Sequence, residues 1–300
     1  MNAMGDMGSM SSIGEAALFD WPLLVCTVAI FGTAVFALLI APVSHPQSEE
    51  SARRVTRLAR WLAAIGVVLS PIAFLDATAE MAGVSITAAI PYFVPVLHQT
   101  HAGRVWAWRL GASAALLAVT WLPGGARRRL CAIAAVAALM LLLGALSSHA
   151  IDHGPSAVAF YFIHEIAAAT WFGGLVGLCS GFATEPLSMD WFSFAAPRVS
   201  RTAGWCLAVL VAAGCFNAYE ALGLDLDHLV YAAYGRTLLC KLLTAAVVVA
   251  IGAYNRHWLV PRSSDPAARR TLVRNVSVES VLLLAVLGWS ARLANTPPPH

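Results

Sequence analysis

Charged side chains are scarce in this sequence. Asp, Glu, Lys and Arg make up 12% of its 300 residues, whereas a soluble globular domain carries about 25%. Lysine occurs once, at Lys241. Hydrophobic residues make up 59% of the chain, and the mean hydropathy is +0.72. This composition excludes an ordinary soluble domain and indicates a membrane protein.

Several motifs are also missing. The six cysteines lie singly inside apolar runs and form no CxxC pair, so we expect neither a disulfide framework nor a zinc site. We see no nucleophile–base arrangement and no nucleotide-binding loop, so we do not expect an enzyme. A net charge of +3 is too small to indicate a nucleic-acid partner. We expect no cleavable signal peptide, because the first apolar run begins near Trp21 and is long enough to span a bilayer.

Long apolar runs recur eight times along the chain. Because backbone groups must be paired inside lipid and the runs are too long for barrel strands, we expect helices. The predicted fold is an all-α, polytopic membrane bundle with eight transmembrane helices. The spans are expected near 20–42, 61–83, 104–122, 129–149, 156–181, 199–222, 235–257 and 273–294.

Arginine alternates between successive loops. The loops after the first, third, fifth and seventh spans carry 14 of the 18 arginines: Arg53, Arg54, Arg57, Arg60, Arg127, Arg128, Arg129, Arg198, Arg201, Arg256, Arg262, Arg269, Arg270 and Arg274. Cytoplasmic loops carry an excess of Lys and Arg, so both termini are expected on the outer, periplasmic side. The chain then divides into a Met-rich outer tail (1–19), helices 1–4 (20–149), a second helical block (150–296) and an outer C-terminal tail (297–300).

Soft and imidazole ligands gather on the predicted outer side. The opening "MNAMGDMGSM" places Met4, Met7 and Met10 at every third position, and thioethers suit Cu(I) better than hard cations. Seven of the nine histidines also fall outside or in the outer part of a span. The pattern indicates a transition-metal site, and the methionines favour copper, as Cu(I) or Cu(II), over zinc.

Ionisable groups inside spans point to the same side. Such groups are costly in lipid and by default face a cavity or a partner. Asp76 and Glu80 share a helix face, and Glu165 adjoins His164 inside the fifth span. For Lys241, Arg292 and Glu279 we expect a structural role such as ion pairing. The candidate metal-site residues are His164, His149, His98, His101, Glu165, His153, Asp76, Glu80, Met4, Met7 and Met10.

Several motifs in the second half occur together in one order. "SSHA" ends the fourth span, and "HEIAAATWFGG" in the fifth fits an H-E-x5-W-x-G-G pattern through His164, Glu165, Trp171, Gly173 and Gly174. "YGRTLLCK", "GAYNR", "RNVSVE" and "ARLANTPPP" come after it. With these motifs the chain resembles the CopD/PcoD family of bacterial copper-resistance and copper-uptake membrane proteins over roughly half its length. The glycines of the pattern are expected to serve close helix packing rather than metal binding.

The resemblance implies a copper-binding protein of the bacterial inner membrane that imports copper from the periplasm. It also implies a possible partner, a periplasmic CopC-type copper chaperone, besides membrane lipid. Two alternatives stay open. One is a b-type haem electron-transfer protein, with haem b held between His149 and His164. The other is a copper-binding or assembly factor that does not transport the metal.

Overall fold

The fold is a bundle of long helices. The computed structural model describes residues 3–40, 48–180, 189–223 and 226–296, and all regular structure within these ranges is helical. The long helices are α1 (Ala3–Val35), α2 (Ser48–Ala82), α4 (His101–Val119), α5 (Ala126–Leu146), α6 (Pro155–Ser180), α7 (Met189–Leu222), α9 (Ala233–Tyr254) and α10 (Pro266–Ala294).

Short elements connect or extend these helices. Two are α-helical, α3 (Phe93–Gln99) and α8 (Leu226–Tyr231), and three are 3-10 turns, η2 (Ile90–Tyr92), η3 (His149–His153) and η5 (Val260–Arg262). The π-helical segments η1 (Phe36–Ile40) and η4 (Asn255–Leu259) continue α1 and α9 without a break. π-Helical turns are rare and are frequent at functional sites.

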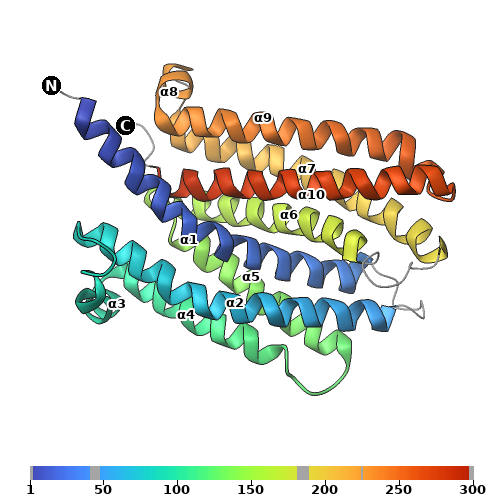
Figure 1. Cartoon of the computed structure of the whole chain (residues 1–300), viewed down its shortest axis with the longest axis horizontal. Coiled ribbons are helices and arrows are strands. Elements are labelled where there is room, and N and C mark those ends of the chain that lie inside the picture. Colours follow the sequence, from blue (N-terminus) through green and yellow to red (C-terminus); the bar gives the residue numbers. More distant parts are fainter. Residues whose placement is uncertain (1–2, 41–47, 181–188, 224–225, 297–300) are drawn as a thin grey trace.

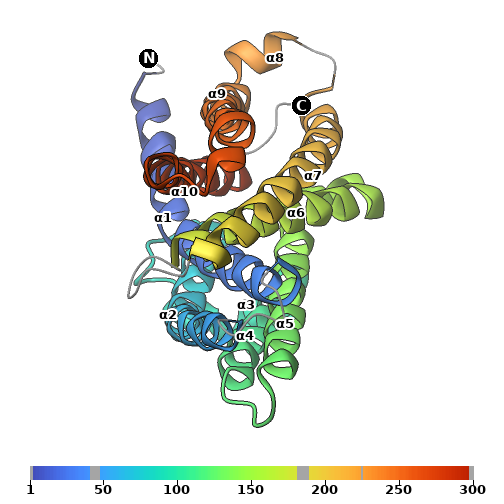
Figure 2. The same cartoon turned by 90° about the vertical axis from the view of Figure 1, so that its right-hand side faces the viewer.

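Helices α1 and α6 form the centre of the bundle. Helix α1 packs on α2, α5, α6 and α10, while α6 also packs on α7 and α10. The two views in Figures 1 and 2 show α2, α4 and α5 on one side of this centre and α7, α9 and α10 on the other. The first half and the second half of the chain therefore meet along α1 and α6.

The contact between α1 and α6 depends on glycine. A Cβ atom on Gly32 would overlap the α6 backbone at Ala169 and Gly173, and a Cβ on Gly173 would overlap the α1 backbone at Gly32. Only hydrogen side chains permit so close an approach of two helices. The expectation that the glycines of the H-E-x5-W-x-G-G pattern serve packing is confirmed for Gly173.

The eight expected spans coincide with the eight long helices. Seven helices in the described ranges are long and apolar enough to cross a membrane. Helix α4, the expected third span, is not one of the seven. It has 19 residues and contains Arg104 and Arg109, which lower its hydropathy. The bundle is therefore a membrane protein with seven candidate spanning helices.

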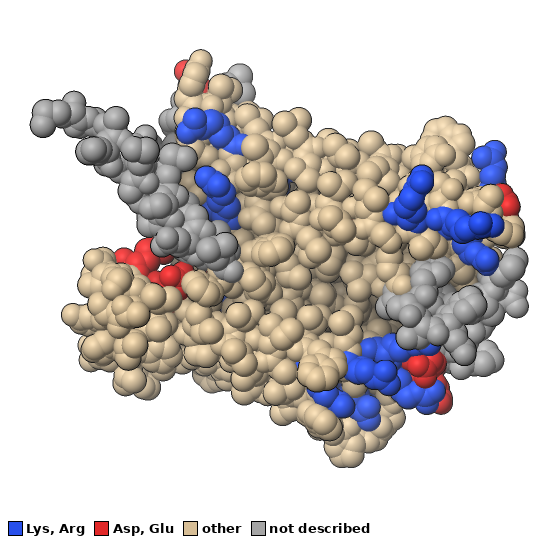
Figure 3. Space-filling view, viewed as in Figure 1, with Lys and Arg blue, Asp and Glu red and all other residues tan. Residues whose placement is uncertain are grey.

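The two ends of the bundle differ in charge. Figure 3 shows most of the visible Lys and Arg side chains at the end where α2 begins and α9 passes into η5, with a broad uncharged band between the ends. We call it the arginine-rich end. The opposite end holds α3, α8 and η3, and the start of α1 and the end of α10 lie toward it (Figure 1). An uncharged band between polar ends is the pattern expected of a protein that crosses a bilayer.

Helix α1 begins much earlier than expected. It starts at Ala3 and runs through the segment that the sequence analysis treats as a tail. The candidate spanning part begins at Phe19, close to the predicted position 20. The side chains of residues 3–18, including Met4, Met7 and Met10, lie outside the part of the chain that the structure describes.

Candidate functional site

A polar chamber lies inside the bundle, toward the end opposite the arginine-rich one. Its volume is about 180 Å³, and since about 10–15 Å³ of such space holds one water molecule, it has room for a metal ion with several waters. Helices α1, α2, α4, α5, α6 and α10 all contribute to its wall. The chamber therefore lies at the junction of the two halves of the chain.

Two charged side chains mark the α1 and α4 sides of the chamber. Asp20 of α1 accepts a hydrogen bond from Asn295 Nδ2 at 3.1 Å, which ties the start of the first span to the end of α10. Arg109 of α4 donates to Ser147 Oγ at 3.2 Å and lies over the Trp106 ring, 4.0 Å from its centroid. Arg109 Nε is buried without a hydrogen-bond partner among the described residues. Arg109 therefore points into the bundle and away from lipid.

The α6 wall of the chamber carries Tyr161 and Glu165. They are four residues apart, so they lie on one face of the helix. Glu165 is 8% exposed and lies about 15 Å along the helix from Pro155. Within the described residues its carboxylate has no hydrogen bond and no ion pair within 4 Å. A buried carboxylate that faces a polar chamber without a direct partner is a candidate cation ligand.

His164 points to a different side of α6. Its ring lies against Gly214 of α7, since a Cβ there would lie 3.5 Å from Cε1 and 3.6 Å from Nδ1. The Leu210 carbonyl lies near the ring, but Nδ1 is buried and makes no hydrogen bond within the described chain. Lys241 of α9 acts electrostatically on both His164 and Glu165. Within the described residues Lys241 makes no ion pair within 4 Å, so its expected pairing with an acidic neighbour stays a prediction.

One soft donor reaches the chamber. Met140 of α5 is 6% exposed and lines the chamber together with Asp20 and Glu165. A thioether together with carboxylates and a nearby imidazole is a ligand set that suits copper better than Mg²⁺ or Ca²⁺. Sequence reasoning missed Met140, because a methionine in the apolar run "AALMLLLG" is indistinguishable from a packing residue before the helix orientation is known.

Sequence reasoning also missed Asp20, Arg109, Tyr161 and Asn295. A usable signal existed for the first two, because Asp20 begins the first apolar run and Arg109 lies inside the third. An ionisable residue in a span is a functional candidate by default. Tyr161 and Asn295 carry no such signal, because their place in the chamber wall depends on how α6 and α10 are rotated.

The remaining predicted histidines lie elsewhere. His98 on α3 and His101 at the start of α4 are exposed and do not line the chamber. His153 Nδ1 lies 3.5 Å from Glu220 Oε2, which links η3 to the end of α7. The side chain of His149 lies outside the described part of the chain. A copper or haem arrangement that needs His149 therefore stays a prediction.

The predicted carboxylates of α2 are also apart from the chamber. Asp76 is half-buried, Glu80 is exposed, and neither lines the chamber wall. Within the described ranges, no three His, Cys, Asp or Glu side chains are arranged to hold a metal ion. Of the predicted site residues with described side chains, the structure brings together His164 and Glu165 on neighbouring faces of α6.

A helical membrane bundle with a polar chamber between its two halves defines the class of this protein. Comparison with known families is more specific. Residues 16–157 match the model of the copper resistance protein D-like N-terminal domain, and residues 194–293 match the model of copper resistance protein D. The chain therefore belongs to the copper resistance protein D (CopD) family.

A curated relative agrees with this assignment. The chain is 28% identical over 242 residues to the inner membrane protein YebZ of Escherichia coli (strain K12), which covers 78% of this chain and 80% of that protein. No solved structure matches the chain. The two matched regions, 16–157 and 194–293, correspond to the two sides of the bundle, with most of α6 between them.

Proposed function

We propose that this protein is an inner-membrane copper importer, which receives copper from the periplasm and passes it to the cytoplasm. Its family supports a role in copper handling, and the name of its relative, inner membrane protein YebZ, supports a place in the inner membrane. The chamber supports binding of the metal inside the membrane. We assign it no catalytic step, and copper is its cargo.

The proposal includes eight spans with both termini outside. Helix α4, the third span along the chain, is added to the seven candidate helices to make eight. It packs between α2 and α5, and Arg109 is compatible with a membrane position because it points into the bundle. Ser70 of α2 and Ser113 of α4 share a hydrogen bond of 2.8 Å, which pairs polar atoms within the bundle. The arginine-rich end is then cytoplasmic, and the chamber lies in the outer half of the membrane.

The observation that carries the proposal is the adjacency of Glu165, which lines the chamber, and His164, which faces α7 on the neighbouring side of α6. Glu165 presents a buried carboxylate to the chamber, and His164 has a buried ring nitrogen without a hydrogen-bond partner in the described chain. A neutral imidazole with a free nitrogen is a ligand for both copper oxidation states. The chamber carboxylates Asp20 and Glu165 attract a cation, and Met140 supplies a thioether.

Copper is expected to reach the chamber from the outer side. The methionines at positions 4, 7 and 10 are suited to capture Cu(I) before transfer inward. A periplasmic CopC-type chaperone is the proposed alternative source of the metal. Both sources place copper at the end of the bundle where His153 and Glu220 lie.

Metal analysis of purified protein tests the proposal, with His164→Ala and Glu165→Gln as the variants and His45→Ala as the matched control. Loss of one ligand should weaken copper affinity by at least about 10–100-fold, and both variants should lose copper uptake in cells. His45 belongs to a predicted cytoplasmic loop, so its variant should keep both properties. Full copper binding and uptake by a folded His164→Ala protein would reject the assignment of this site. A Soret band in the visible spectrum of the purified protein would instead favour the haem alternative.

A further inference from the structure

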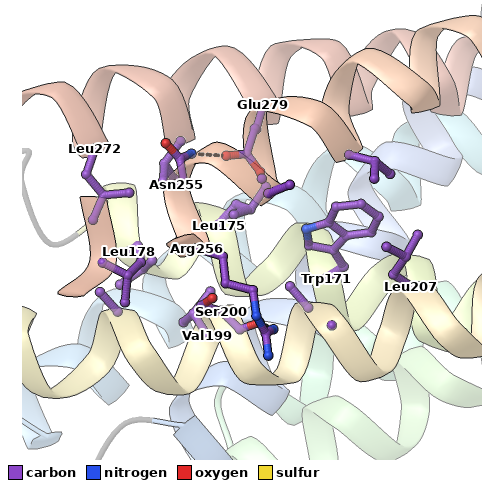
Figure 4. A pocket seen from close by; sticks show the side chains of 18 of the residues that line it. Trp171, Leu175, Leu178, Val199, Ser200, Leu207, Asn255, Arg256, Leu272 and Glu279 are labelled. Carbon is purple, nitrogen blue, oxygen red and sulfur yellow. Dashed lines mark hydrogen bonds between the residues drawn. The ribbon is translucent and has the colours of Figure 1, made fainter. Parts of the chain in front are cut away.

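A second cavity lies between α6, α7, η4 and α10, nearer the arginine-rich end. Its volume is about 160 Å³, and most of its wall is apolar, including Trp171 and Leu175 of α6 and Leu207 of α7. Figure 4 shows the Glu279 carboxyl and the Asn255 amide joined at the cavity, with Arg256 and Ser200 across from them. The predicted copper ligands do not line this cavity.

Glu279 is held at the cavity by an oriented hydrogen-bond chain. Asn275 Nδ2 donates to Asn255 Oδ1 at 2.8 Å, and Asn255 Nδ2 donates to Glu279 Oε1. The Asn275 bond fixes the orientation of the Asn255 amide, so that its NH₂ group faces the carboxylate. Asn255 is the first residue of the π-helical segment η4. The carboxyl group is therefore positioned by a specific arrangement of α10 and η4.

The second oxygen of Glu279 has no such partner. Glu279 is 2% exposed, and within the described chain Oε2 accepts no hydrogen bond and has no ion pair within 4 Å. The position that a Cβ of Gly252 would take lies 3.4 Å from Oε2. The expected ion pair of Glu279 is therefore not seen, because its direct partner is an amide. A buried carboxylate without a counter-ion is costly, and a bound proton removes that cost.

The surrounding groups do not replace the counter-ion. Arg256 of η4 donates instead to the Ser200 carbonyl at 2.9 Å. His257 also lines the cavity from η4, and it is exposed. From α6, Cys179 Sγ lies 3.7 Å from Ser277 Oγ of α10. Helix α7 contributes no titratable side chain to the described wall of this cavity.

We propose that Glu279 is a proton-binding site, whose carboxyl group takes up and releases a proton at Oε2 through this cavity. The ligand is a proton, and no other bond is made or broken in the exchange. If the protein transports copper as proposed above, the positive charge of the ion in the bundle favours loss of this proton. Glu279 would then couple copper passage to the proton gradient. Proton binding itself does not depend on that coupling.

Infrared difference spectroscopy of the purified full-length protein across a pH series tests proton binding without copper. The wild-type protein should show the carbonyl stretching band of a protonated carboxyl, which titrates and shifts in D₂O. Glu279→Gln should remove this band, because the amide keeps an oxygen for the Asn255 bond but binds no exchangeable acid proton. Glu50→Gln is the matched control, since Glu50 pairs with Arg53 and Arg54 outside the cavity and should leave the band unchanged.

A second experiment distinguishes failure of the proton-binding proposal from failure of the import proposal. In proteoliposomes, Glu279→Gln should bind as much copper as the wild type but lose the stimulation of uptake by an imposed pH gradient, whereas His164→Ala should lose copper binding as well. Identical titrating bands in wild type and Glu279→Gln would overturn the proton site whatever the copper result. Full copper binding by His164→Ala with loss of the band in Glu279→Gln would reject the copper site alone.

Discussion

Replacing Gly173 by Ala should destabilise the bundle through a single methyl group. The added Cβ would overlap the α1 backbone at Gly32, so α1 and α6 must move apart or bend. Overpacking of this kind costs about 1–3 kcal/mol. Here the obstacle is backbone rather than the end of a flexible side chain, so we expect the upper half of this range. The two central helices would also lose part of their shared contact.

Gly111→Ala is the matched control. Gly111 is an exposed glycine of α4, and a Cβ there would meet no atom within 4 Å. The same chemical change should therefore stabilise the protein by about 0.4–1 kcal/mol, because alanine restricts the unfolded chain. The two substitutions are expected to have opposite signs, which separates the helix contact from the general effect of Gly→Ala.

The assay is SDS-driven unfolding of the purified protein in mixed micelles, followed by tryptophan fluorescence and circular dichroism. A double variant with Gly32→Ala should cost less than the sum of the two single variants, because both open the same contact. If Gly173→Ala were as stable as Gly111→Ala, the close approach of α1 and α6 would be wrong. The arrangement of the chamber between them would then be in doubt.

Two further predictions concern the surface. The first uses a protein without its native cysteines, with one new cysteine at position 228 or at position 262. An impermeant maleimide should label the cysteine at 228 in intact cells and leave the one at 262 unlabelled. The reverse pattern would place the arginine-rich end outside. Removing residues 1–12, with a new initiating Met, should weaken copper accumulation at limiting copper and leave it nearly intact at excess copper, because the tail captures metal. Loss of accumulation at every copper concentration would show that the tail is part of the central site.

The helices could be predicted because their signal is local. Each expected span coincides with one long helix, since about 20 consecutive apolar residues are needed to cross a bilayer whatever the rest of the chain does. Helix α4 shows the limit of this signal. Arg104 and Arg109 reduce its apolar character, yet Arg109 faces the chamber, and hydropathy does not report the direction of a side chain.

The chamber could be predicted only in part because it is assembled from six helices. His164 and Glu165 stood out as adjacent ionisable residues within one span. The two are separated by about 100° around α6, and the structure directs them to different sides, toward α7 and toward the chamber. Asp20 and Met140 join Glu165 only through the packing of α1 and α5 against α6. No spacing along the sequence encodes that contact.

Glu279 illustrates a different limit. Its position in a span was visible in the sequence, and an ion pair was the expected explanation. The structure gives it Asn255 as a partner, from the π-helical turn η4. A π-helical turn departs from the regular 3.6-residue period, so that period does not predict which way the residues of η4, Asn255 among them, face.

The H-E-x5-W-x-G-G motif gains a physical meaning from these contacts. Glu165 lines the outer chamber, while Trp171 lines the second cavity, and the step of six positions from one to the other corresponds to about 9 Å along α6. Copper that takes the proposed route must therefore cross this segment of α6, where Ala167 and Ala169 are buried. Gly173, just beyond it, meets the α1 backbone at Gly32, and one turn further along α6 the Phe36 ring packs against Gly177. Passage of copper from the chamber toward the cytoplasmic side would therefore require this packed contact between α1 and α6 to open.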